Sequence, residues 1–149
     1  MAILTISSGM PGFRLVQCIG RVAPDHICGM TRFTKAPRFA GLEAMAQLGA
    51  LDVRRRIDFQ GHAFLLKVIR CRWPSAKWLD GRFALRADLG SQSRRAYVYR
   101  TEARGPHGVI LSAELMFGCM DYDQRFQKIN LDHHYRKMFA CLQRVTDAN

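Results

Sequence analysis

The stretch PRFAGLEAMAQLGALDV, from Pro37 to Val53, decides the fold. Apolar or small side chains lie almost all the way round its helical projection, and a helix that is apolar on all sides is normally buried. Glu43 and Gln47 interrupt its middle, and they share one face because residues four apart on a helix are neighbours. Burial penalises an ionised carboxylate, so we expect a desolvated Glu43 that acts as an acid, a base or a ligand-positioning group. A structural glutamate satisfied by backbone amides or an arginine is the alternative.

Strand patterns surround this helix on both sides. Residues 13–22 and 26–34 predict a hairpin across the Pro24-Asp25 turn. After the helix, runs at 62–73, 81–89, 94–103 and 109–120 alternate with Gly-rich turns, as in an antiparallel meander. Residues 124–145 predict a helix within a C-terminal tail of residues 124–149. Since the apolar helix needs cover on every side, we expect an α+β class in which a curved antiparallel sheet wraps it. The expected organisation is one domain over residues 1–149, with its core at about 13–122.

Composition excludes several classes of protein. The five cysteines have no short paired spacing, so neither a zinc site nor a disulfide framework is indicated, and a cytoplasmic location fits best. No signal peptide or membrane span is expected. The net charge of +11 is spread over the predicted strands and turns without a nucleic-acid motif, so we do not expect a nucleic-acid partner. An acidic protein or a phosphorylated cofactor is compatible with the same charge.

One segment resembles a known family. The string GLEAMAQLGAL, from Gly41 to Leu51, followed by the meander, resembles the central helix and sheet of hotdog-fold 3-hydroxyacyl-carrier-protein dehydratases. The preceding APRFAGLEAMAQ also looks like the helix start in the dehydratase-like proteins of aryl-polyene synthesis. The resemblance covers about 13–122 and implies a hotdog fold and a homodimer or higher oligomer. It also implies a thioester substrate on a phosphopantetheine arm, delivered by acyl carrier protein or as acyl-CoA, with no bound cofactor.

The same resemblance assigns candidate site residues. Glu43 matches the family's acidic residue, but the histidine that the family places just before the helix has no counterpart between Met30 and Gln60. His26 is the nearest candidate catalytic partner; a strand histidine bonded to a turn is the alternative. The amides of Phe39 and Ala40 at the helix start are candidate donors to the thioester oxygen.

Several other residues have two interpretations. Gln47 either contacts substrate or serves as a packing amide. Arg54, Arg55 and Arg56 are either solvated charge at the helix end or, with Arg38, a dock for an acidic carrier protein. The two tryptophans of RCRWPSAKW, residues 70 to 78, either line a tunnel mouth or pack in the core. No metal site is expected.

These observations favour a dehydratase-like lyase acting on 3-hydroxyacyl thioesters in fatty acid or polyketide-type metabolism, with Glu43 as acid and base. Three alternatives remain open. The first is a thioesterase of the same fold in which Glu43 orients water. The second is a non-catalytic module that binds an acyl chain or a carrier protein, and the third is an arginine-rich nucleic-acid binder.

Overall fold

The computed structural model describes residues 14–122 and 128–147. The predicted start of the core at residue 13, and residues 124–127 and 148–149 of the predicted tail, lie outside this range. The described elements in chain order are β1 (Cys18–Val22), β2 (His26–Pro37), α1 (Arg38–Arg56), β3 (Gly61–Arg72), β4 (Trp78–Gln92), β5 (Ala96–Gly105), β6 (Gly108–Asp121) and α2 (Lys128–Asp147).

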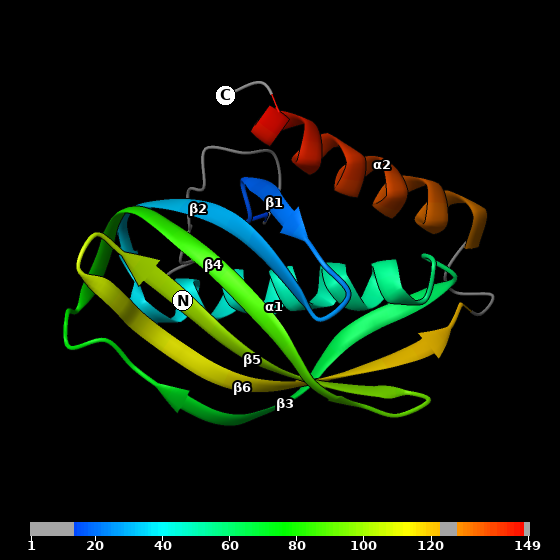
Figure 1. Ribbon diagram of the computed structural model, residues 1–149, viewed down its shortest axis with the longest axis horizontal. Helices are drawn as coiled ribbons and strands as arrows, with labels where there is room; N and C mark the ends of the chain where they lie inside the picture. Colours follow the sequence, from blue (N-terminus) through cyan, green and yellow to red (C-terminus); the bar gives the residue numbers. More distant parts are fainter. Residues whose placement is uncertain (1–13, 123–127, 148–149) are drawn as a thin grey trace, which may run out of the picture.

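The described strands form one antiparallel sheet in the order β1-β2-β4-β5-β6-β3. The sheet curves around α1, which contacts strands β2 to β6, while α2 lies outside the sheet against β1 (Figure 1). The predicted hairpin, central helix and meander are all present, and the α+β class is confirmed. The mostly apolar helix α1 is therefore covered by a curved sheet, as its composition predicts.

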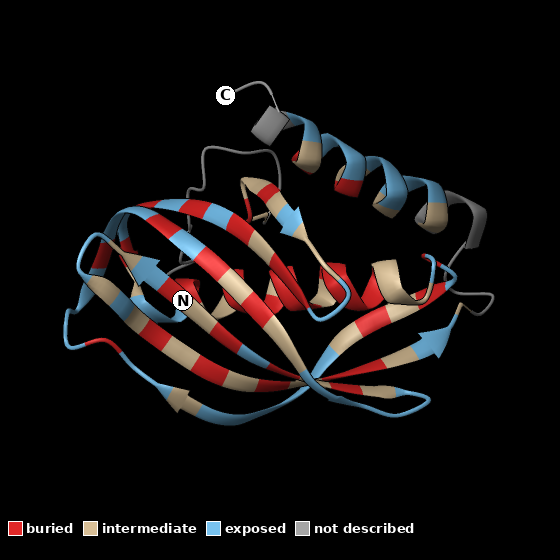
Figure 2. Cartoon of the chain, in the orientation of Figure 1, coloured by how far each residue is buried: buried red, intermediate tan, exposed pale blue. Residues whose placement is uncertain are grey.

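Burial differs between the helix and the strands in the way their geometry dictates. Figure 2 shows buried residues along most of α1 and alternating along the strands, because successive side chains of a strand point to opposite faces. On β5, Tyr97, Tyr99 and Thr101 are buried. The alternation selects one face of the sheet for the core.

Two glycines let α1 lie close to the sheet. A Cβ at Gly41 would lie 2.7 Å from Leu111 and 2.9 Å from Leu79, and a Cβ at Gly49 would lie 2.6 Å from the Phe117 ring. Real Cβ atoms do not approach so closely, so a side chain at Gly41 would displace the two leucine methyls and one at Gly49 would displace the Phe117 ring or the helix. The glycines thus fix which face of α1 meets the sheet and, by exclusion, which face is left for Glu43.

Strand β3 is an edge of the sheet and is unusually apolar for an edge. It pairs with β6 on one side, while Leu65, Leu66, Val68 and Ile69 expose 37–52% of their surface. Exposed edge strands normally carry charges or prolines that prevent pairing with another chain. The same strand carries the exposed Lys67, Arg70 and Arg72, so this edge combines apolar side chains with charged ones.

Candidate functional site

Glu43 and Gln47 lie on the side of α1 that faces away from the sheet. The Gln47 side-chain amide donates from Nε2 to Glu43 Oε1 at 3.2 Å, and its Oε1 accepts the backbone N–H of Leu15 at 2.8 Å. The predicted shared face is therefore present, with Gln47 bridging Glu43 to the segment before β1. Both side chains are half-buried. The expectation of a desolvated Glu43 is therefore wrong, because this face of the helix keeps partial contact with water. A half-buried carboxylate with a fixed orientation can accept a proton from a water molecule or a substrate.

The start of α1 lies one turn from Glu43. Pro37 is the N-cap and supplies no side-chain cap, and the first turn contains no acidic residue. The first N–H groups of a helix have no partner within the helix, and the helix dipole favours negative charge near them. The Phe39 side chain is 46% exposed and Ala40 is fully buried. The N–H groups of these two residues belong to this first turn, whose donors have no partner within the helix.

His26 lies at the other end of the helix. Its Nδ1 is 2.8 Å from Asp25 Oδ1, and its ring is buried, with Nε2 making no hydrogen bond. Arg55 donates to the carbonyl oxygen of Ala23, so the turn before β2 lies beside the C-terminal end of α1. At about 1.5 Å per residue, Arg55 is roughly 18 Å along the helix axis from Glu43. The structure does not bring His26 and Glu43 together within one chain.

The three arginines at the end of α1 are engaged inside the fold. Arg54 is 5% exposed and bonds the carbonyl oxygens of Gly61 and Ala63. Arg55 and Arg56 both donate to the carboxylate of Asp52 in the same helix, and their side chains are 27% and 14% exposed. Little guanidinium surface is left at this end for a carrier protein. Arg38, at the other end, is exposed, with a 3.4 Å bond to the Pro74 carbonyl oxygen.

Asp52 is the fully buried carboxylate of α1, and sequence reasoning missed it. Its Oδ1 accepts from Arg55 at 2.7 and 2.9 Å, and its Oδ2 accepts from Arg56 Nε at 2.8 Å and from the Tyr99 hydroxyl at 2.7 Å. Burial and the neighbouring Asp52 charge raise the pKa of Tyr99 far above its ordinary value. The spacing of Asp52 to Arg55 and Arg56, three and four residues on, was the available signal for this network. It ties α1 to β5.

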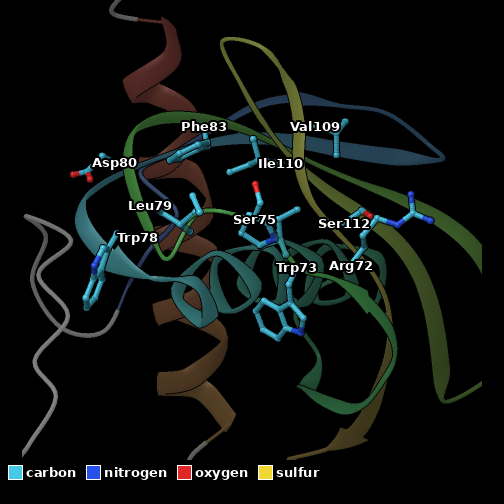
Figure 3. Close-up of a pocket in the computed structure, with 13 residues that line it drawn as sticks. Arg72, Trp73, Ser75, Trp78, Leu79, Asp80, Phe83, Val109, Ile110 and Ser112 are labelled. Atoms are coloured by element: carbon cyan, nitrogen blue, oxygen red, sulfur yellow. The ribbon is translucent and has the colours of Figure 1, made fainter.

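A cavity of about 560 Å³ lies beside the N-terminal end of α1. Figure 3 shows Trp73, Trp78 and Phe83 around it, with residues of the β3–β4 connection and the start of β6. Trp73 and Trp78 are 45% and 42% exposed, so they line this cavity and do not pack in the core. Leu79 and Leu111 form part of its wall and also contact the Gly41 turn of α1. Its lining mixes apolar residues with polar ones such as Arg72 and Asp80, and it includes no residue of α1.

Within residues 14–122 and 128–147, no group of three His, Cys, Asp or Glu side chains is placed to hold a metal ion. Of the helices in this part of the chain, neither has the length and apolar character needed to cross a membrane.

Comparisons with known proteins show similarity in structure but none in sequence. No family model matches the sequence, and no curated protein matches it. Among solved structures, the dehydratase heterocomplex ApeI:P of Xenorhabdus doucetiae matches with a TM-score of 0.62 at 15% identity, covering 78% of this chain and 88% of that chain. The chain has the hotdog fold.

Thioesterases of the same fold match to a similar degree. A thioesterase of Haemophilus influenzae has a TM-score of 0.59 at 12% identity, with 69% of this chain and 77% of that chain covered. A hypothetical thioesterase of Streptococcus pneumoniae, solved with coenzyme A, has a TM-score of 0.58 at 15% identity, with 71% and 90% covered. At these identities the hotdog likeness establishes the fold and leaves the reaction to the site residues.

Proposed function

We propose that this hotdog chain is an enzyme of acyl-thioester chemistry in which Glu43 moves the proton. The observation that carries the proposal is the Glu43 carboxylate itself, held by Gln47 at 3.2 Å, half-buried and one turn from an uncapped helix N-terminus. A base and a set of oxyanion donors are the two elements that attack on a thioester carbonyl requires.

Hydrolysis is the reaction that the residues of one chain favour. Glu43 takes a proton from a water molecule, and the water oxygen forms a bond to the thioester carbon. The Phe39 and Ala40 amides stabilise the negative charge on the carbonyl oxygen. The carbon–sulfur bond then breaks, and the proton held by Glu43 passes to the leaving thiolate. The products are a free carboxylic acid and a free thiol. In the described part of the chain, the hydrogen bond at the Glu43 carboxylate comes from Gln47 and none comes from a histidine.

Dehydration of a 3-hydroxyacyl thioester is the second candidate, and the likeness to the dehydratase heterocomplex favours it. That reaction removes a proton from the carbon beside the carbonyl and protonates the departing hydroxyl, so it needs a second acid or base in reach of the substrate. A histidine from a partner subunit would supply that group beside Glu43. The lyase proposal therefore requires an assembly, whereas the thioesterase proposal does not require a second chain's histidine.

The assembly and carrier are part of the proposal. The apolar β3 edge supports a dimer in which the two sheets join, and the net charge of +11 supports an acidic carrier or the phosphates of coenzyme A. Arg38 is the proposed contact for that carrier, because it is exposed beside the helix start. The burial of Arg54 and the Asp52 pairing of Arg55 and Arg56 favour a structural role for those three over docking.

The test measures two products from the same protein. Acyl-CoA substrates of different chain lengths are assayed for thiol release, and an enoyl-CoA is assayed for hydration by loss of its conjugated absorbance. Glu43→Gln keeps the side-chain shape and should lower the active reaction by about 10²- to 10⁴-fold, the usual contribution of a general base. The matched control is Glu114→Gln, a half-buried glutamate on β6.

Each outcome selects between the alternatives. Thiol release that depends on Glu43 supports the thioesterase, and hydration that depends on Glu43 supports the dehydratase. A reaction that survives Glu43→Gln removes Glu43 from the mechanism. If neither product forms, both enzymes are excluded, and binding of an acyl group without turnover becomes the surviving function.

A further inference from the structure

A second cavity, of about 250 Å³, lies on the Gln47 side of α1, toward its C-terminal end. Its polar lining comes from Arg14, Gln47, Arg54 and Tyr135, and its apolar lining includes Val16 and Met138. Positions 47 and 54 are seven apart and share a helix face, while Tyr135 and Met138 come from α2. The cavity therefore lies between α1 and α2, and α2 itself packs against β1.

Arg54 is a buried cation in this cavity whose charge has no anionic partner among the described residues. Its guanidinium bonds the carbonyl oxygens of Gly61 and Ala63 at 3.4 and 3.2 Å and lies 3.3 Å from His62 Nδ1. The Tyr135 ring covers one face, with its centroid 3.6 Å from Cζ. No carboxylate of residues 14–122 or 132–144 forms an ion pair with it. Burial lowers the pKa of Arg54, which is the direction expected of a cation whose lost hydration is not compensated by an anion.

Arg14 adds a second guanidinium with an unused donor. Its Nε is buried and makes no hydrogen bond. A buried donor without a partner costs about 1–3 kcal/mol, and such groups in native structures call for a ligand, a water or an ion. Arg14 and Arg54 line the same cavity, so an anion bound there would place its negative charge near both cations.

We propose that this cavity binds a small organic carboxylate with an apolar body, such as an aromatic or short aliphatic acid. Two guanidinium groups match the oxygens of a carboxylate, which is a planar acceptor that arginine bonds with good geometry. The walls formed by Val16 and Met138 need an apolar group to fill them. The volume equals that of about eight liquid waters at ~30 Å³ each, enough for an acid of that size. Inorganic phosphate would leave the apolar walls unfilled. Gln47 lines this cavity and also bonds Glu43, so the two sites are neighbours, but carboxylate binding by the two arginines does not require the Glu43 reaction.

The experiment is calorimetric titration of the full chain with benzoate, and with benzamide as its neutral match. Benzoate should bind at least tenfold more tightly than benzamide, because the neutral amide places N–H donors against guanidinium donors. Arg14→Gln should weaken benzoate binding about tenfold or more, whereas Arg104→Gln, at an exposed arginine on β5, should leave it unchanged. Thermal melts show that each variant is folded.

A second variant keeps the test decisive if Arg14→Gln unfolds. Ala50→Phe places a ring in the cavity while both arginines remain, and it should abolish benzoate binding. Four results would overturn the proposal: no binding at millimolar benzoate, equal binding of benzoate and benzamide, displacement of benzoate by equimolar inorganic phosphate, or full binding by folded Ala50→Phe. The readout is binding alone, so a failure here is distinct from a failure of the Glu43 reaction.

Discussion

Replacing Asp52 with asparagine should destabilise the fold far more than replacing an exposed aspartate. Asp52 is 0% exposed, and its two oxygens accept bonds from Arg55, Arg56 and the Tyr99 hydroxyl at 2.7–2.9 Å. Asparagine keeps the shape but removes the charge and turns one acceptor into an N–H donor facing other donors. Breaking a buried ion pair by removing one partner costs about 3–5 kcal/mol, a large part of a total stability of about 5–15 kcal/mol.

The assay is urea unfolding followed by circular dichroism, with thermal melts alongside. A loss of about 3–5 kcal/mol corresponds to a fall in Tm of about 6–20 °C for a chain of this size. Asp88→Asn is the matched control, because Asp88 pairs with Arg86 at 2.8 Å but both side chains are partly exposed. That exposed pair should contribute about 0–1 kcal/mol.

A double-mutant cycle with Tyr99→Phe tests the network directly. Tyr99→Phe alone removes one hydrogen bond to a charged group, at a cost of about 1.5–3 kcal/mol. Its effect should shrink by about 1 kcal/mol or more in the Asp52→Asn background, because the two groups are in contact. Equal losses of stability for Asp52→Asn and Asp88→Asn would contradict this role of the buried network. So would a double mutant in which the effects of Asp52→Asn and Tyr99→Phe simply add.

Three further outcomes are expected. Gly49→Ala should cost about 1–3 kcal/mol in urea unfolding, because its Cβ would lie 2.6 Å from the Phe117 ring, whereas Gly20→Ala, with 3.9 Å to its nearest neighbour, should cost less; equal losses would contradict the close packing. Leu66→Lys on the β3 edge should shift the proposed dimer toward monomer in sedimentation velocity, and an unchanged sedimentation coefficient would place the dimer contact elsewhere. Burial and the Arg54 charge lower the pKa of His62, so the unfolded chain takes up a proton first as pH falls below about 6.5, and stability should decrease there. His62→Gln should flatten this decrease in pH-dependent unfolding, and an unaltered slope would assign it to other groups.

The sequence predicted the fold well because one segment left few alternatives. A helix as apolar as Pro37 to Val53 must be covered on most sides, and the alternating runs around it supplied strands to cover it. The pairing of Glu43 with Gln47 followed from helical spacing alone.

The candidate site was less predictable, because it depends on which face of the helix meets the sheet. Gly41 and Gly49 turn one face inward, and Glu43 is left half-buried on the other. Periodicity cannot rank faces of a helix that is apolar all round, so the sequence could not show that Asp52, and not Glu43, is the fully buried carboxylate. Likewise His26 is close to Glu43 in sequence but lies beside the opposite end of α1, because a long strand separates it from the helix start.

The sequence by itself thus determined the class of fold, the central helix and the acidic pair on one of its faces, since these follow from local spacing and from the need to bury apolar surface. Only the tertiary structure decided how the charges are partnered. Arg55 and Arg56 turn back to Asp52, while Arg54 and Arg14 line a cavity without a carboxylate. Partnering of buried charges depends on contacts between residues far apart in the chain, and these distances are set by how the sheet closes over the helix and not by sequence spacing.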